Sequence, residues 1–271
     1  QLTRADLAAY EAVPHEPVRA RYRGCEVLTN SPPFAGGTLL ALSLARLDAH
    51  GPGPPRLADV VAAMEAAQDQ RTPAFVAGLA EPGFAERFLA AHLGSTTHLS
   101  VVDADGLACS MTCTNGEGSG VVVPGTGIHV NNVMGEEDLS PLGFFTAPPG
   151  RKMPSMMAPT VVLGPEGEVE LVLGSAGSNR IRSAILQVVV GVVDHALHAG
   201  EAVLAPRVHF EDGVVYAEPG APVEELGGHE VVRFAARNLF FGGVQAVERD
   251  RRTGALSGAG DPRRGGAAVA A

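Results

Sequence analysis

The spacing of apolar residues along the chain changes at about residue 96. Before this point apolar residues recur every three to four positions in several stretches, which predicts α-helices. These predicted helices cover 3–12, 38–49, 56–70 and 83–93. Thr3 and Asp6 occupy capping-box positions in the first of them. Polar and apolar residues alternate over 17–30, which predicts a hairpin of two strands.

After residue 96 the apolar period falls to two, which is typical of strands with one buried face. The predicted strands cover 96–103, 107–114, 125–132, 158–164 and 169–174. One further helix is predicted over 178–200, with Gly200 at its C-terminal end. Helices and strands that gather in blocks favour an α+β fold over strict alternation of strand and helix.

Composition narrows the classes of protein. The chain has 271 residues, of which 45% are hydrophobic, enough for a packed core in one large domain or two small ones. The net charge of -10 argues against a nucleic-acid partner, which would need a basic stripe. No apolar run approaches the ~20 residues of a membrane span. Because the chain begins with Gln1 and shows no targeting segment, we expect a piece of a longer protein.

The three cysteines are Cys25, Cys109 and Cys113, and their spacing fits neither a disulfide framework nor a metal site. Cys109 and Cys113 lie four positions apart in a predicted strand, so they share one face. We expect both to be small buried hydrophobic residues. The sequence indicates no metal and no organic cofactor.

The hairpin that begins at Thr96 places hydroxyl groups close together. With a two-residue loop at Ala104-Asp105, Thr96 lies opposite Cys113 and beside Thr112 and Thr114. A register shifted by one residue puts Thr114 directly opposite Thr96. In either register the second strand returns hydroxyl groups to the start of the first.

A threonine hydroxyl needs a nearby base before it acts as a nucleophile. Cleavage between Ser95 and Thr96 would supply that base, because a free α-amino group has a pKa of about 8. The plain alternative is that Thr96 and Thr97 are ordinary strand-forming residues. His98 shares the strand face of Thr96, and we interpret it as structural.

Two other stretches are candidates for chemistry. A strand, a Gly/Ser turn and a helix follow one another around Gly177 and Ser178, and the free N–H groups at such a helix start can stabilise an oxyanion. The alternative is a simple helix cap by Ser178 or Asn179. The acidic cluster 136–138 could bind a substrate ammonium group, or it is a solvated loop.

Five stretches in this order closely resemble motifs of the γ-glutamyltranspeptidase family. They are TTHLSVVDADG, GIHVNN, MPSMMAPT, GSAGSNRI and GAGDPRR. The resemblance runs through nearly all of 96–271, and PPFAGG resembles the late part of the family's large subunit. It implies an N-terminal-nucleophile hydrolase with a four-layer αββα sandwich, made as a precursor that cuts itself. Residues 1–95 would end the large subunit as a helical lobe, and residues 96–271 would form the small subunit.

The resemblance also implies catalytic roles. Thr96 would be the nucleophile, Thr114 would hold its hydroxyl and amino groups, and Gly177 with Ser178 would form the oxyanion hole. The family commonly has a Gly-Gly pair where this chain has Gly177-Ser178. The implied activity is hydrolysis or transfer of γ-glutamyl groups from glutathione and related amides, with water or an amine as acceptor.

For the substrate, the resemblance implies that Ser155 contacts the glutamyl carboxylate and Glu136 its ammonium group. Asn115 only approximately fills the position of a substrate-binding asparagine. Met156 replaces a second pocket serine, and Val133 replaces an amide or acid. These changes leave open an acylase with a different acyl group, or a non-catalytic relative.

The resemblance bears on two further points. It places the arginine that grips the carboxylate upstream of Gln1. It also leans towards a periplasmic or extracellular location, although the sequence itself does not reveal the compartment.

Overall fold

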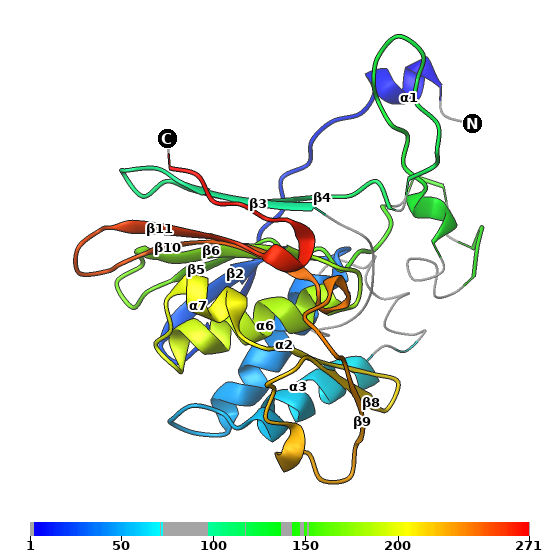
Figure 1. The fold of residues 1–271 in the computed structure, drawn as a ribbon. Helices are drawn as coiled ribbons and strands as arrows, with labels where there is room; N and C mark the ends of the chain where they lie inside the picture. Colours follow the sequence, from blue (N-terminus) through cyan, green and yellow to red (C-terminus); the bar gives the residue numbers. More distant parts are fainter. Residues whose placement is uncertain are drawn as a thin grey trace.

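A six-stranded antiparallel sheet forms the centre of the molecule in a computed structural model (Figure 1). The structure describes residues 3–70, 72, 97–116, 118–136, 143–146, 149–150 and 152–270. The strand order is β1-β2-β5-β6-β10-β11. The bounds of these strands are β1 Val18–Tyr22, β2 Cys25–Thr29, β5 Thr160–Leu163, β6 Val169–Ala176, β10 Gly243–Arg249 and β11 Leu256–Gly260.

Helices α2 (Ala35–Ala49), α6 (Arg180–Val193) and α7 (Ala199–Leu204) cover one face of this sheet, and α3 (Leu57–Asp69) packs against α2 (Figure 1). Helix α2 packs against α6 and β1 on one side and α3 on the other, so most of its faces are buried, as the sequence predicts. The main hydrophobic core lies between these helices and the sheet, and it includes Leu40, Leu44, Leu171, Leu173 and Ile185.

The hairpin of β3 (Thr97–Val102) and β4 (Ala108–Cys113) covers the opposite face of the sheet. Its inner side is polar: the Ser100 hydroxyl donates to the Gln245 carbonyl at 3.2 Å, and the Ser110 hydroxyl donates to the Leu173 carbonyl at 3.0 Å. The α+β class is therefore confirmed, with helices, sheet and hairpin stacked in that order in the described part of the chain.

The outer face of the hairpin is apolar and exposed. Leu99, Val101 and Met111 are 40%, 52% and 44% exposed. Cys109 and Cys113 share this face, as predicted, but both are exposed, so the expectation of burial is wrong. The reason is that the face of β4 turned towards the sheet carries the polar residues, which hydrogen-bond to strand carbonyls.

The remaining elements lie at the periphery. A small sheet of β7, β8 and β9 lies beside α3, with β7–β8 antiparallel and β8–β9 parallel. The bounds of the peripheral elements are α1 Arg4–Ala8, η1 Val133–Gly135, β7 Val208–Glu211, β8 Val214–Ala217, η3 Val223–Glu225, β9 Glu230–Arg233, η4 Leu239–Phe241 and η5 Pro262–Arg264. Within the described ranges, no helix is both long enough and apolar enough to cross a membrane.

Several predicted elements are confirmed. Helix α1 is shorter than predicted, but Thr3 and Asp6 form the capping box. The hairpin over 17–30 and the helices over 38–49 and 56–70 are present, as are the strands over 158–164 and 169–174. The helix predicted over 83–93 falls outside the described residues.

Two predicted elements are wrong. The segment 125–132 forms no strand and makes a single bridge, between Val122 and His129, because it is exposed and two of its glycines have positive φ. The helix predicted over 178–200 ends at Val193. There the Asp194 carboxylate accepts hydrogen bonds from Tyr22 and Arg23, and Ala196 adopts a φ of 52°.

Candidate active site

The ends of five strands meet at one edge of the central sheet. In the antiparallel registers Thr29 pairs with Thr160, Ala176 with Gly243, and Gln245 with Gly260. The end of β2, the start of β5, the end of β6, the start of β10 and the end of β11 are therefore neighbours. The Gly177–Ser178 turn follows β6 and the Asp261–Arg264 turn follows β11, so both lie at this edge. Ser155 lies there because its carbonyl bonds to the start of α2, which packs on Thr29 at the end of β2.

The hairpin over the sheet has the second of the two registers considered for it. Thr97 pairs with Cys113 and Val102 with Ala108. The loop has three residues instead of two, and its last residue, Gly106, has a φ of +90°. Such a loop is a standard hairpin connection that requires a left-handed residue. The two-residue loop is therefore wrong, and Thr96 itself lies outside the described residues.

His98 holds β3 against the central sheet. Its Nδ1 lies 2.8 Å from the Thr112 hydroxyl, and its Nε2 lies 2.9 Å from the Ser100 hydroxyl. The ring packs so closely on Gly174 that a Cβ there would overlap it. Burial lowers the pKa of His98 to about 4, so the imidazole is neutral. Both ring nitrogens are occupied, which supports the structural interpretation of His98.

A tight turn after β4 brings three predicted site residues together. The Thr114 hydroxyl accepts the N–H of Gly116 at 2.9 Å, and the Asn115 carbonyl accepts the N–H of Asn132 at 3.1 Å. Gly116 has a φ of +61°, and a Cβ there would overlap carboxylate oxygen Oε1 of Glu136 and amide oxygen Oδ1 of Asn132. Thr114, Asn115 and Glu136 therefore belong to one cluster.

Ser155 lies on the β5 side of the edge, clamped by the start of α2. Its carbonyl accepts the N–H groups of Ala35 at 2.8 Å and Gly36 at 3.1 Å. The residue is only 5% exposed, and its hydroxyl has no hydrogen-bond partner among the described residues. A buried hydroxyl without a partner is costly, which is expected where a ligand completes the site.

The Gly177–Ser178 turn joins β6 to α6 at the centre of the edge. Gly177 has a φ of +127° and Ser178 of +58°, and Asn179 then adopts helical angles. Successive left- and right-handed residues point neighbouring N–H groups to one side and form an anion-binding concavity. A Cβ on Gly177 would lie 2.7 Å from Cα of Gly242, so the turn requires glycine there.

The hydrogen bonds described so far hold these groups separately. None of them runs between the Thr114 turn, Ser155 and the Gly177 turn. The hairpin and the sheet edge nevertheless share one space, because Thr97 and Ala176 both line a cavity of ≈ 450 Å³. Of the acidic cluster 136–138, only Glu136 is described.

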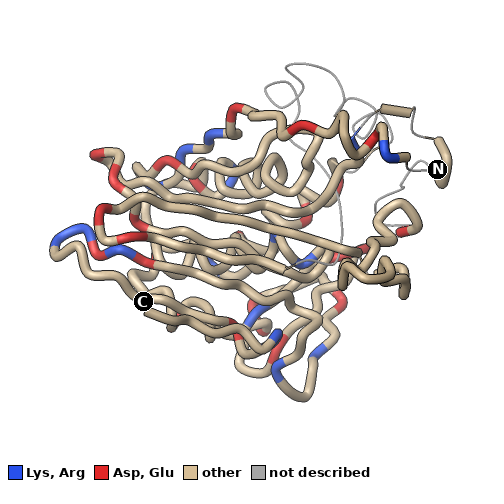
Figure 2. Tube along the Cα trace, turned by 90° about the horizontal axis from the view of Figure 1, so that it is seen from above, with Lys and Arg blue, Asp and Glu red and all other residues tan. Residues whose placement is uncertain are grey.

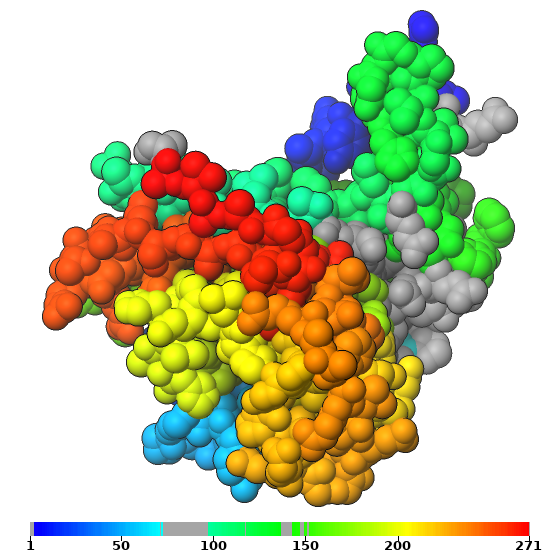
Figure 3. Space-filling model, viewed as in Figure 1, coloured from blue at the N-terminus to red at the C-terminus, as the bar shows by residue number. Residues whose placement is uncertain are grey.

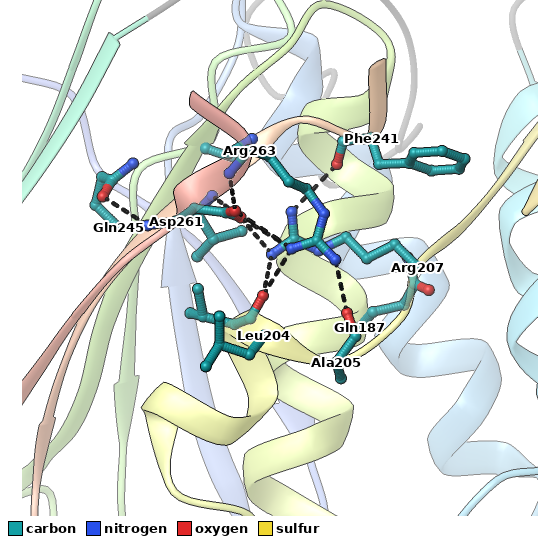
Figure 4. Close-up of polar contacts among 12 residues, drawn as sticks. Gln187, Leu204, Ala205, Arg207, Phe241, Gln245, Asp261 and Arg263 are labelled. Atoms are coloured by element: carbon teal, nitrogen blue, oxygen red, sulfur yellow. Dashed lines mark hydrogen bonds and ion pairs between the residues drawn. The ribbon is translucent and has the colours of Figure 1, made fainter. Parts of the chain in front are cut away.

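A buried ionic network fixes the β10 side of the edge (Figure 4). Arg207 Nη2 lies 2.7 Å from Asp261 Oδ2, and Arg263 lies 2.5 Å from Glu218 and 3.2 Å from Asp261. All four side chains are buried. Two positive and two negative charges leave no net charge, which is what makes such a cluster tolerable away from water.

The pKa values show how tightly this network is enclosed. Burial, partly offset by Asp261, lowers the pKa of Arg207 to about 10. Burial raises the pKa of Glu218, but the hydrogen bond and charge of Arg263 outweigh it, so the net pKa lies below the ordinary value. Arg207 and Glu218 are therefore charged at neutral pH, and the network anchors η5 beside the Gly177 turn.

Acidic and basic residues elsewhere are interspersed along the described chain (Figure 2). Within the described ranges, no group of three or more His, Cys, Asp or Glu side chains is placed to hold a metal ion.

Comparison with known proteins identifies the family. The family model described as Gamma-glutamyltranspeptidase matches residues 1–271. The chain belongs to the γ-glutamyltranspeptidase family. The Acylase ACY 1 proenzyme of Pseudomonas sp. (strain SE83) is 33% identical over 99% of this chain and 54% of its own length. The Glutathione hydrolase proenzyme of Escherichia coli (strain K12) is 30% identical over 78% of this chain and 44% of its own.

Solved structures of the family agree with the fold. Gamma-glutamyltranspeptidase from Pseudomonas nitroreducens complexed with L-DON is 34% identical, with a TM-score of 0.54 over 65% of this chain and 99% of that one. Cephalosporin acylase from Bacillus halodurans is 25% identical, with a TM-score of 0.75 over 98% of this chain and 55% of that one. The chain spans about half the length of the curated relatives it matches.

Sequence reasoning missed two parts of this site. Asn132, whose amide oxygen accepts the N–H of Gly118 at 2.9 Å, completes the Thr114 cluster. The second asparagine of the Asn-Asn pair was a signal for it. The Asp261–Arg264 turn is part of the motif GAGDPRR, and its acidic residue followed by two basic ones, directly after a strand, is a signal for an ionic anchor.

Proposed function

We propose that this chain carries the nucleophile and substrate pocket of a γ-glutamyl hydrolase or transferase that acts on glutathione and related γ-glutamyl amides. One observation carries the proposal in addition to family membership. The described ladder pairs Thr97 with Cys113. Continued by one residue, this register would set Thr114 opposite Thr96, and the second threonine would then orient the first.

In the proposed reaction the precursor is first cut between Ser95 and Thr96. The new α-amino group of Thr96 accepts the proton of its own hydroxyl, whose oxygen attacks the γ-amide carbonyl carbon. N–H groups of Gly177 and Ser178 stabilise the negative oxygen. The leaving amine takes the proton, an ester on Thr96 remains, and water or an acceptor amine then releases the acyl group.

The proposed glutamyl pocket uses Ser155, Glu136 and Asn115. The unpartnered hydroxyl of Ser155 supports a hydrogen bond to the substrate carboxylate. Glu136 and Asn115 lie in one cluster with Thr114, which supports binding of the substrate ammonium group beside the nucleophile. No metal and no organic cofactor enters this reaction.

We further propose that residues 1–95 end the large subunit and residues 96–271 form the small subunit of one self-cleaved precursor. The exposed apolar outer face of the β3–β4 hairpin supports a further layer there, as a four-layer αββα sandwich requires. The proposed partners are the two subunits themselves, a small γ-glutamyl substrate and an acceptor.

An acylase with a different acyl group is a second candidate. Acylases are among the relatives that match nearly the whole chain. Met156, at the position where the family has a second serine, is fully buried, so the pocket beside Ser155 is more apolar than the family pattern implies. The proposed pocket thus lacks one hydroxyl of the family pattern, which would favour an acyl group with fewer polar substituents.

The test uses the precursor protein and its Thr96→Ala variant. We expect mass spectrometry to find a chain break before Thr96 in the wild type and one intact chain in the variant. γ-Glutamyl-p-nitroanilide and glutaryl-p-nitroanilide differ only in the α-amino group. A wild type that prefers the first supports the γ-glutamyl function, and one that prefers the second supports the acylase. An uncut protein inactive on both would contradict the enzyme proposal and leave the non-catalytic relative.

A further inference from the structure

We infer that Arg264 binds an anionic group, a carboxylate, on the leaving-group or acceptor side of the scissile bond. This inference rests on the proposed function and adds a specificity residue to it. Arg264 is the last residue of η5, and the ionic network of its neighbours Asp261 and Arg263 fixes that turn in place. The backbone that carries the Arg264 side chain is therefore anchored.

The Arg264 side chain lies beside the proposed oxyanion turn. A Cβ on Gly177 would lie 3.6 Å from Arg264 Nη2. The aliphatic part of Arg264 runs along Gly243, where a Cβ would meet its Cβ, Cγ and Cδ atoms at 2.9 Å. The absence of a side chain at these two glycines thus leaves room for the guanidinium to reach the turn. Arg264 also lines the ≈ 450 Å³ cavity together with Thr97.

The charge of Arg264 lacks a protein partner. Among the described residues, it makes no hydrogen bond or ion pair through its guanidinium, and its side chain is open to solvent. Neighbouring arginines differ: Arg263 pairs with Glu218 and Asp261, and Arg180 pairs with Glu211 at 3.7 Å and stacks on Phe240. Partial burial and the charge of Arg180 lower the pKa of Arg264, although Asp261 opposes them. An anion placed beside Arg264 would relieve this repulsion.

The strand order decides which side of the substrate Arg264 faces. Ser155 lies on the β5 side of the Gly177 turn, and Arg264 lies on its β10 side. If Ser155 holds the carboxylate of the acyl group, then Arg264 lies on the opposite flank of the reacting carbonyl. That flank receives the leaving amine and, after it, the acceptor. A leaving group with its own carboxylate, such as a dipeptide, has the chemistry to pair with a guanidinium.

The C-terminal segment, residues 265–269, bounds the space on this flank. In Figure 3 this segment lies along the β3–β4 hairpin and β10–β11. Gly265 to Val269 line the cavity next to Arg264. A ligand in this space would therefore meet the guanidinium of Arg264 beside small residues of this segment, with neutral polar side chains of the hairpin and β10 across the cavity.

The test compares two substrates that differ by one carboxylate on the leaving group, γ-glutamyl-p-nitroanilide and γ-glutamyl-3-carboxy-4-nitroanilide. We expect Arg264→Gln in the precursor protein to lower kcat/KM for the carboxylated anilide about tenfold, which corresponds to ~1.4 kcal/mol. The value for the plain anilide should change less than about twofold, and Arg264→Lys should recover part of the loss. Because the pair is open to solvent, added salt should reduce the wild-type preference.

Arg252→Gln is the matched control, since Arg252 is an exposed arginine on the β10–β11 turn at the far end of the sheet. Equal losses on both anilides would overturn the inference and assign Arg264 a role in the turn itself. An unchanged ratio of the two rates in an active enzyme would overturn it as well. A wild type inactive on both anilides would refute the proposed function, and the leaving-group site with it.

Discussion

The two flanks of the sheet edge are built in different ways. On the β5 flank, Ser155 is held by backbone contacts: two N–H groups from the start of α2 bond to its carbonyl, and Gly36 packs directly on Met156. On the β10 flank, the turn that carries Arg264 is held by a buried network of charges around Asp261. The first flank presents a neutral hydroxyl, and the second presents a cation.

This difference determines which substitutions would disrupt the structure of each flank. Close backbone packing tolerates no added atom, so its weak points are glycines. A buried network of charges tolerates no missing partner, because one charge left alone in the interior is very unfavourable. The same edge thus combines a neutral flank, sensitive to steric change, with a charged flank, sensitive to loss of a charge.

The largest effect is expected from Asp261→Asn. This change leaves Arg207 without its carboxylate partner and removes one partner of Arg263. We expect the free energy of unfolding to fall by about 3–5 kcal/mol, the usual cost of breaking a buried ion pair. Urea denaturation of the purified protein measures it, with Asp69→Asn, at the exposed end of α3, as control. A loss below ~1 kcal/mol would show that the charges do not hold this flank.

An intermediate effect is expected from Gly36→Ala. A Cβ on Gly36 would overlap the Met156 carbonyl, so α2 or the Ser155–Met156 backbone must shift, at about 1–3 kcal/mol. Because the shift moves Ser155, KM for γ-glutamyl-p-nitroanilide should rise more than kcat falls. Gly200→Ala in α7 is the matched control, since nothing lies within 4 Å of its added Cβ. An unchanged KM with lost stability would separate Gly36 from the substrate pocket.

Local pattern predicted much of the fold. The helices α2 and α3 and the strands β5 and β6 follow directly from apolar periodicity. Apolar periodicity gave wrong predictions where the structure depends on residues that are distant in the sequence. Helix α6 ends early at a point where Asp194 is bound by Tyr22 and Arg23, which lie far away in the sequence. The exposure of Cys109 likewise follows from which hairpin face meets the sheet, and a period of two cannot determine that.

For the site, the sequence motifs identified individual residues but could not predict which other residues contact them in the fold. The turn of Thr114 and Asn115 was predicted, but its packing against Glu136 and Asn132 depends on Gly116 having no side chain. Ser155 was named through family resemblance, whereas its clamp by α2 joins residues more than a hundred positions apart. That Arg264 has no ion-pair partner in the described part of the chain becomes visible only from the structure, in which Asp261 and Glu218 pair with Arg207 and Arg263.

The smallest effect is expected from His98, which holds the hairpin over the middle of the edge, between the two flanks. Its folded pKa of about 4 lies below the ordinary value of 6.5 because the ring is buried. The unfolded chain therefore binds a proton at a pH where the folded protein does not, and stability falls as the pH drops below 6.5. Between pH 7.5 and 5.5 we expect His98 to contribute a loss of about 1.3 kcal/mol in the free energy of unfolding.

Urea denaturation at both pH values measures this loss. In His98→Gln this part of the pH dependence should disappear. In the control His15→Gln, at an exposed position, it should remain. The groups around the ring are the hydroxyls of Thr112 and Ser100 and the backbone of Gly174. If His98→Gln keeps the full wild-type dependence, the acid sensitivity arises elsewhere and the contacts of Ser100 and Ser110, not His98, hold the hairpin over the two flanks.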